Sequence, residues 1–245
     1  MLVEACVDSV ESAIAAERGG AGRLELCDNL HDGGTTPSAG MIAAVKNAVN
    51  IPVFVIVRPR GGGFVYTDAE LDVMRRDIEA AARLGADGIV LGVLTRQADV
   101  DADRTRRLLD VAPELPATFH RAFDLVRDQR AALESIATLG VARVLTSGGA
   151  ASALDGASTI AELVRQSSNR VTLMAGGGVR EENVSEIVRR SGVREVHVRG
   201  TRLAHTSMTP DNERVRFRKA MPSDEGAWEE TDESRIREIV RLASS

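Results

Sequence analysis

Aromatic side chains are scarce in this 245-residue chain, which has one Trp, one Tyr and five Phe. Hydrophobic residues nevertheless make up 43% of the sequence and charged residues 27%, an ordinary balance for a globular protein. We therefore expect a sizeable core built mainly from Val, Leu, Ile and Ala.

Cysteine is also rare, and two residues are too few for a secreted disulfide scaffold. No apolar run approaches the ~20 residues of a membrane span, and the first residues, MLVEACVDSVESA, lack the basic region of a signal peptide. Basic residues are not in excess, since 31 Lys and Arg against 36 Asp and Glu give a net charge of −5. These absences predict a cytoplasmic protein that binds neither membranes nor nucleic acids.

What the chain does contain is an alternation of short β-rich runs with segments of helical spacing. Most of the runs are continuous and apolar, as expected of parallel strands buried on both faces. Apolar residues at i, i+3 and i+4 predict helices, for example over 160–164, and a stripe at 236–240 supplies a closing helix. The expected strands are LVEAC (2–6), RLELC (23–27), VFVIV (53–57), GIVLG (88–92), ATFH (117–120), RVLTS (143–147), VTLMA (171–175) and EVHV (195–198).

Four junctions repeat a glycine that ends a helix, a small residue and then a strand: RGGAGRLEL, RLGADGIVL, TLGVARVLT and RSGVREVHV. Glycine suits this place because it enters the left-handed region without strain. The strands, their connecting helices and the closing helix predict a single (β/α)8 TIM barrel over residues 1–245. An open doubly wound sheet is disfavoured because VDSVES, not a G-x-G-x-x-G motif, follows the first strand.

The segment from Gly200 to Asp232 is polar, contains Trp228 and two prolines, and shows no convincing period. We predict that it forms a long loop between the eighth strand and the closing helix. Such a loop would cover one rim of the barrel or a partner subunit.

Polar residues gather at the C-terminal ends of the predicted strands, where the active face of a TIM barrel lies. Several charges at one mouth favour ligand binding, and the alternative is an ion network that only stabilises the barrel. The candidate ligand-binding residues are Glu4, Glu25, Arg58, Arg60, His120, Arg121, Thr146, Ser147, Gly176, Gly177, Gly178 and His197.

Three of the polar residues are candidates for catalysis: Glu25, His120 and Asp124. His120 titrates near neutrality and ends a strand, so His120 and Glu25 suit acid–base chemistry. The alternative for His120 is an oriented core histidine. Asp124 is placed either to fix a histidine tautomer or to pair with an arginine.

Glycine-rich loops follow the third and seventh strands. The consecutive glycines Gly176–Gly178 lie where barrels often bind phosphate through backbone N–H groups, and a tight turn is the alternative. Arg58, Arg60 and three glycines after the third strand predict a mobile lid that attracts anions.

The two cysteines lie on neighbouring predicted strands. Cys6 and Cys27 come two residues beyond Glu4 and Glu25, respectively, so their sulfurs can approach each other. A pair of thiolates with few other ligands suits Cu(I) better than Mg²⁺ or Ca²⁺. The alternative is that both are small buried hydrophobic side chains.

Taken together, ELC…GGTTPS, RPRGGGFVY, TFHRAFD, LTSGG, AGGGV and EVHV resemble the CutC family of copper-homeostasis-type barrel proteins. The resemblance implies a TIM barrel, a cytoplasmic homodimer and copper homeostasis. It also implies that Cys6 and Cys27 match positions where family members carry cysteines associated with Cu(I). The chain differs from its relatives in two places. Val198-Arg199-Gly200 follows His197, where relatives often have small polar residues, and the first strand has one Cys where some relatives have two.

Two functions therefore stay open. The resemblance implies copper ion binding through Cys6 and Cys27. The inventory of polar residues favours an enzyme of unknown reaction that acts on a small phosphorylated or carboxylated molecule. A non-catalytic sensor that uses the same pocket is a third option.

Overall fold

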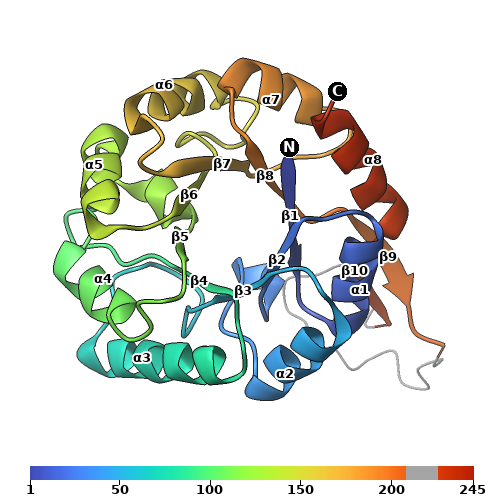
Figure 1. The fold of residues 1–245 in the computed structure, drawn as a ribbon, viewed down its shortest axis with the longest axis horizontal. Coiled ribbons are helices and arrows are strands. Elements are labelled where there is room, and N and C mark those ends of the chain that lie inside the picture. The colour runs from blue at the N-terminus through green and yellow to red at the C-terminus, as the bar shows by residue number, and fades with distance from the viewer. Residues whose placement is uncertain (208–225) are drawn as a thin grey trace, which may run out of the picture.

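A computed structural model of the protein describes residues 1–207 and 226–245, and eight parallel strands form a closed barrel in the order β1 to β8. Figure 1 shows the helices as a ring around these strands. The predicted TIM barrel is confirmed. The barrel strands are β1 Leu2–Val7, β2 Arg23–Leu26, β3 Val53–Ile56, β4 Gly88–Leu91, β5 Ala117–Phe119, β6 Arg143–Thr146, β7 Thr172–Gly176 and β8 Glu195–Val198.

Each strand agrees with its prediction to within one residue at either end. The helices are α1 Val10–Arg18, α2 Ala39–Ala48, α3 Asp68–Arg83, α4 Ala102–Leu109, α5 Gln129–Leu139, α6 Ala157–Ser167, α7 Val184–Ser191 and α8 Glu233–Ala243. Two 3-10 helices, η1 Leu30–Asp32 and η2 Arg121–Leu125, follow β2 and β5. Among the described residues, none of the helices combines the length and the apolar character of a membrane span.

The hydrophobic core lies between the outer faces of the strands and the helices. It is mainly aliphatic, as predicted, although Phe119 and Phe123 are among its largest fully buried side chains. The apolar stripes of the helices face it, since Ile160 of α6 and Ile236 of α8 are both completely buried. Burying a side chain of this size contributes roughly 1.5–3 kcal/mol.

The four glycine junctions turn the chain from a helix into the next strand, as predicted. Their glycines all have left-handed backbones, with φ of +92°, +82°, +78° and +71° at Gly20, Gly85, Gly140 and Gly192.

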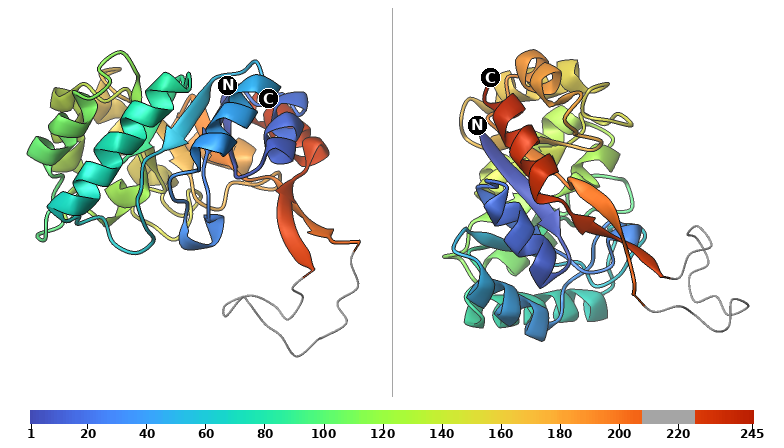
Figure 2. Two further views of the ribbon diagram at one scale, coloured as in Figure 1. Left: turned by 90° about the horizontal axis from the view of Figure 1, so that it is seen from below. Right: turned by 90° about the vertical axis from the view of Figure 1, so that its right-hand side faces the viewer.

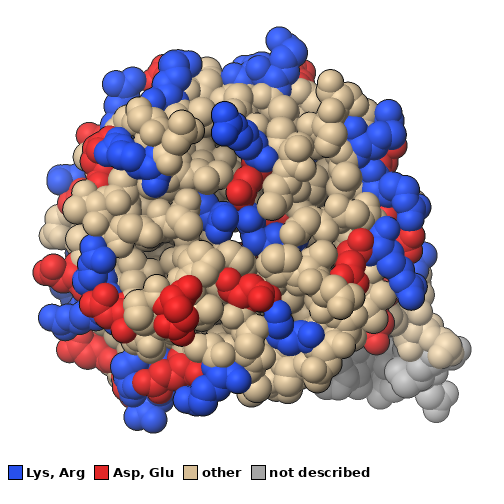
Figure 3. Space-filling view, in the orientation of Figure 1, with Lys and Arg blue, Asp and Glu red and all other residues tan. Residues whose placement is uncertain are grey.

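Alternate residues of each strand point into the barrel, and several of these inward residues are charged. Strand register places Glu4 beside Arg23 of β2 on one side and His197 of β8 on the other. Arg23 forms ion pairs with Glu4 and with Glu195, and Arg143 also pairs with Glu195. Figure 3 shows acidic and basic side chains in the hollow at the centre of one barrel end. Glu4 therefore belongs to a buried ion network, one of the two alternatives that the sequence left open.

The segment after β8 is not the simple loop that the sequence predicts. Residues Thr201–His205 (β9) and Ala227–Thr231 (β10) pair as an antiparallel ribbon. Figure 2 shows the ribbon at the end of the barrel opposite the N-terminus. The pattern was missed because many side chains of the ribbon are exposed, Leu203 by 58% and Trp228 by 41%, so it lacks a clear apolar period. The rest of the predicted loop, 208–225, lies outside the described residues.

Candidate functional site

A cavity of about 710 Å³ opens at the end of the barrel where the strands finish. This volume is typical of a small-molecule site, which spans roughly 300–1,000 Å³. Eight of the residues predicted to bind ligand or metal line it: Cys6, Glu25, Arg58, His120, Arg121, Gly177, Gly178 and His197. The other predicted residues are not part of its wall: Glu4, Cys27, Arg60, Thr146, Ser147 and Gly176.

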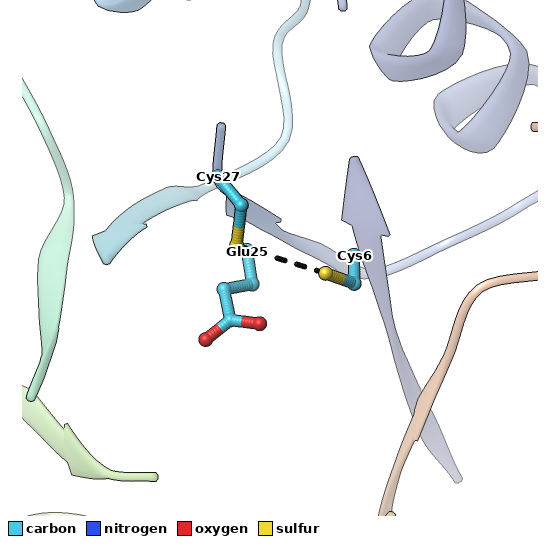
Figure 4. Close-up of side chains that lie close together, drawn as sticks. All are labelled: Cys6, Glu25 and Cys27. Carbon is cyan, nitrogen blue, oxygen red and sulfur yellow. Dashed lines mark hydrogen bonds between the residues drawn. The ribbon is translucent and has the colours of Figure 1, made fainter. Parts of the chain in front are cut away.

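The two cysteines lie together at the cavity, one in its wall and one behind it. The Sγ atoms of Cys6 and Cys27 are 3.7 Å apart, and neither cysteine forms a disulfide. Figure 4 shows the two sulfurs facing each other, with the Glu25 side chain beside them. Cys6 lines the cavity, whereas Cys27 lies behind it, with its sulfur 3.2 Å from where a Cβ on Gly34 would be. Glycine at position 34 therefore leaves room for the Cys27 sulfur.

Glu25 completes a group of three possible metal ligands with the cysteines. One donor atom from each of Cys6, Glu25 and Cys27 lies within 4.8 Å of the other two. Within the described part of the chain, no other three His, Cys, Asp or Glu residues gather in this way. Apolar side chains, among them Phe54 and Ile56, pack against the cysteines and keep that side of the group dry.

His197 connects the cysteines to the ion network below them. Its Nδ1 is 2.9 Å from a carboxylate oxygen of Glu4, and its Nε2 is 3.5 Å from one of Glu25. Burial would lower the pKa of His197, but Cys6, Glu25 and Glu4 raise it well above its ordinary value. Burial would likewise raise the pKa of Glu4, but the His197 hydrogen bond and the charge of Arg23 lower it to about 2. The Glu4 carboxylate therefore stabilises the imidazolium form of His197.

The protons of the cysteine group are unequally shared. The hydrogen bond with Cys27 lowers the pKa of Cys6 despite burial, and His197 lowers it further. The same bond, together with burial, raises the pKa of Cys27. Burial and the charge of Cys6 raise the pKa of Glu25. Cys6 is therefore the more acidic of the two thiols, and Glu25 holds its proton more strongly than an exposed carboxyl group does.

His120 lies elsewhere in the cavity wall and has a neutral ring. Burial and the nearby charge of Arg58 lower the pKa of His120 to about 3. The Ala122 N–H donates to its Nδ1 at 3.2 Å, so the ring proton sits on Nε2. That Nε2 is buried and has no hydrogen-bond partner in the described residues. The backbone of η2 thus sets the tautomer of His120. Asp124 does not fix it, although this was one of the two roles expected for that residue.

Asp124 takes the other expected role, since it pairs with Arg121 at 2.7 Å. Thr146 and Ser147 also bind this carboxylate, through the Thr146 hydroxyl at 2.5 Å and the Ser147 N–H at 3.0 Å. Thr146 and Ser147 therefore hold Asp124, and the Ser147 hydroxyl also donates to it at 3.0 Å. Arg121 in turn lies against Gly177, where a Cβ would be 3.1 Å from the guanidinium carbon.

The arginines after β3 fasten loops. Arg58 donates to the carbonyls of Asp32 and Gly34, both at 2.7 Å, and to Gly62 at 2.9 Å. Arg60 donates to Glu70 and to the carbonyl of its own loop residue Gly63, and it lies outside the cavity wall. Arg58 thus shapes the cavity, whereas Arg60 ties the loop to α3.

The glycines after β7 serve a tight turn and also border the cavity. Gly177 and Gly178 have φ of +103° and +69°, and the Asn183 side chain donates to the Gly178 carbonyl at 2.8 Å. Gly176 is the last residue of β7, packed against Leu145 and His197.

Several residues of the site escaped the sequence analysis. Arg23 and Glu195 share the inward parity of Glu25 and His197 on their strands, and that parity is the signal that could have revealed them. Arg180 and Arg199 line the cavity from the loops after β7 and β8. No motif marks these two, because loop residues lack a period.

Comparison of the sequence with known proteins identifies relatives in one family. The sequence model of the CutC family matches residues 1–202. The human copper homeostasis protein cutC homolog is 45% identical over 244 residues, which cover 100% of this chain and 89% of the human protein. A family protein CutC of Xanthomonas campestris pv. campestris is 45% identical over 243 residues, covering 99% of this chain and 98% of that protein.

Two solved structures resemble this chain, one a member of the same family and one in its fold alone. The crystal structure of CutC from Streptococcus agalactiae is 37% identical, with a TM-score of 0.78 over 80% of this chain and 97% of that one. Thiamine phosphate pyrophosphorylase from Pyrococcus furiosus has a TM-score of 0.62 at 16% identity, over 99% of this chain and 95% of that one, and shares the fold alone.

Proposed function

This chain belongs to the CutC family, and on that premise we propose that it binds Cu(I) between Cys6 and Cys27 as a copper homeostasis protein. The observation that carries the proposal is the 3.7 Å separation of the two sulfurs. Human and mouse relatives are named copper homeostasis protein cutC homologs, which supports the same role. The cytoplasmic location and the homodimer stay predictions of the family resemblance.

The donor set fits a soft metal ion. Thiolates select Cu(I) and Zn²⁺, whereas Mg²⁺ and Ca²⁺ require oxygen ligands. A thiolate–metal bond of about 2.3 Å, the length known for zinc, with the sulfurs 3.7 Å apart gives an angle of about 107° at the metal. Such a bent pair leaves room for a third ligand.

Glu25 is the residue in reach for that third position. Its carboxylate lies within 4.8 Å of both sulfurs and on the side of the cavity. His197 lies next to Glu25, and the pKa of each group is raised, so either one must lose a strongly held proton before it can bind a metal. The site therefore supplies two sulfurs and a third donor, Glu25 or His197, that becomes more available as the pH rises.

The test is an anaerobic titration of the reduced protein with Cu(I) against a colorimetric competing chelator. We expect tight binding of one ion per chain, lost in the Cys6→Ser/Cys27→Ser variant. His31→Ala is the matched control, because His31 is an exposed potential ligand outside the cysteine group and its loss leaves binding unchanged. Binding that survives the removal of both sulfurs contradicts the proposal.

A further inference from the structure

Two of the buried donors in the cavity wall lie in one corner of it and are not used by the cysteine group. His120 Nε2 and Arg58 Nε are both buried and have no hydrogen-bond partner among residues 1–207 and 226–245. Buried donors in native structures are almost always paired, so an orphaned one calls for a partner from outside the chain. Two orphaned donors in the wall of one cavity point to a ligand with acceptor atoms.

Both residues contact the same aromatic ring. The Phe64 ring centroid is 4.9 Å from that of His120 and 5.1 Å from the guanidinium carbon of Arg58. Phe64 follows the glycines Gly61–Gly63 in the loop after β3. The two donors therefore belong to one corner of the cavity.

The charge of the cavity wall identifies the kind of acceptor. Arg58 bonds to carbonyl groups, and within the described residues no carboxylate pairs with it or with Arg180. The other rim arginines are paired, for example Arg199 with Glu229 at 2.8 Å. Asp32, whose carboxylate bonds to a neutral side chain, offsets one of the two unmatched cations. A positive charge is left over, and it favours an anion.

We propose that this cavity binds a small organic oxyanion, a carboxylate or a phosphate ester, that accepts a hydrogen bond from His120 Nε2 beside Arg58 and Arg180. The volume of about 710 Å³ accommodates a molecule of metabolite size. Because the backbone N–H of Ala122 holds the tautomer, His120 donates as a neutral group throughout the physiological pH range. The proposal goes beyond copper binding and requires neither sulfur.

The first test follows His120 itself, in wild-type protein labelled with ¹⁵N-histidine. Malonate and glycerol 3-phosphate are the two anionic probes, and glycerol is the neutral control. We expect one of the anions at millimolar concentration to shift the His120 Nε2 resonance, whereas glycerol does not. The anion that binds more tightly identifies carboxylate or phosphate ester as the ligand. If neither anion shifts this resonance, or glycerol shifts it equally, the proposal is wrong.

The second test uses variants and calorimetry with the tighter of the two anions. His120→Phe keeps a flat ring and removes the donor, and we expect about tenfold weaker binding, as for the loss of one hydrogen bond to a charged acceptor. Arg180→Ala weakens binding several-fold, whereas Arg189→Ala on the exposed face of α7 is the matched control and has no effect. Equal affinities in all three variants overturn the assignment.

The copper proposal and the anion proposal can be tested independently of each other. The Cys6→Ser/Cys27→Ser variant loses Cu(I) and is expected to bind the anion as the wild type does. If that variant loses the anion as well, the anion site is not independent of the cysteines and the inference is wrong. Should His120→Phe not fold, the titration of the wild-type protein still decides.

Discussion

Replacing Glu4 with Gln tests the ion network inside the barrel. The pKa of the Glu4 carboxyl falls from 4.5 to about 2 on folding, because the His197 hydrogen bond and the Arg23 charge outweigh burial. A group whose pKa is lowered on folding stabilises the fold above its unfolded value and loses that effect as the pH falls through the folded value. A difference of about 2.5 units corresponds to about 3.4 kcal/mol. Of this, about 0.8 kcal/mol is lost by pH 4 and about 2 kcal/mol by pH 3.

The assay is urea unfolding of the wild type and of Glu4→Gln from pH 6 to pH 3. At pH 6 the variant is less stable by about 3–5 kcal/mol, because Arg23 and His197 lose a buried partner. The gap narrows by about 2 kcal/mol at pH 3, and the contributions of the titrating groups that Glu4 does not contact cancel in the difference. A gap that is constant over this range would refute the reasoning. If the variant does not fold, the ¹³C carboxyl shift of Glu4 in the wild type, expected to be flat down to pH 3, gives the same answer.

Two further predictions concern the metal site and the cavity wall. The affinity for Cu(I) rises about tenfold per pH unit from pH 6 to pH 8, because burial and the bond to Cys6 raise the pKa of Cys27, whose proton the metal must displace. The same chelator titration at several pH values measures this, and a flat profile means that Cys27 is already ionised. Gly92→Ala places a Cβ 2.5 Å from the His120 ring and costs about 1–3 kcal/mol, whereas Gly40→Ala, in an open part of α2, stabilises by about 0.5–1 kcal/mol. Urea midpoints distinguish the two, and similar shifts for both glycines would contradict this view of the wall.

The barrel could be predicted from the sequence because its strands and helix ends follow recurring sequence patterns. Strands buried on both faces appear as short apolar runs, and glycines such as Gly140 and Gly192 mark the point where a helix ends. The ribbon of β9 and β10 leaves no such trace, since neither of its faces is fully buried.

The site could be predicted only in part. Strand ends and inward parity place Cys6, Glu25 and His197 at one mouth, and a sequence can express that. The direction of a loop side chain depends instead on carbonyl groups that no pattern encodes. Arg60 donates to Glu70 and to carbonyl groups of its own loop and does not line the cavity. The Ser147 hydroxyl likewise donates to Asp124.

The most direct test of the account is X-ray absorption at the copper edge on the Cu(I)-loaded, reduced protein. The account predicts two sulfur scatterers, from Cys6 and Cys27, and one nitrogen or oxygen at shorter distance, in a bent arrangement. The sulfur signal should disappear in the Cys6→Ser/Cys27→Ser variant. A spectrum of the wild type that contains only nitrogen and oxygen ligands would contradict it.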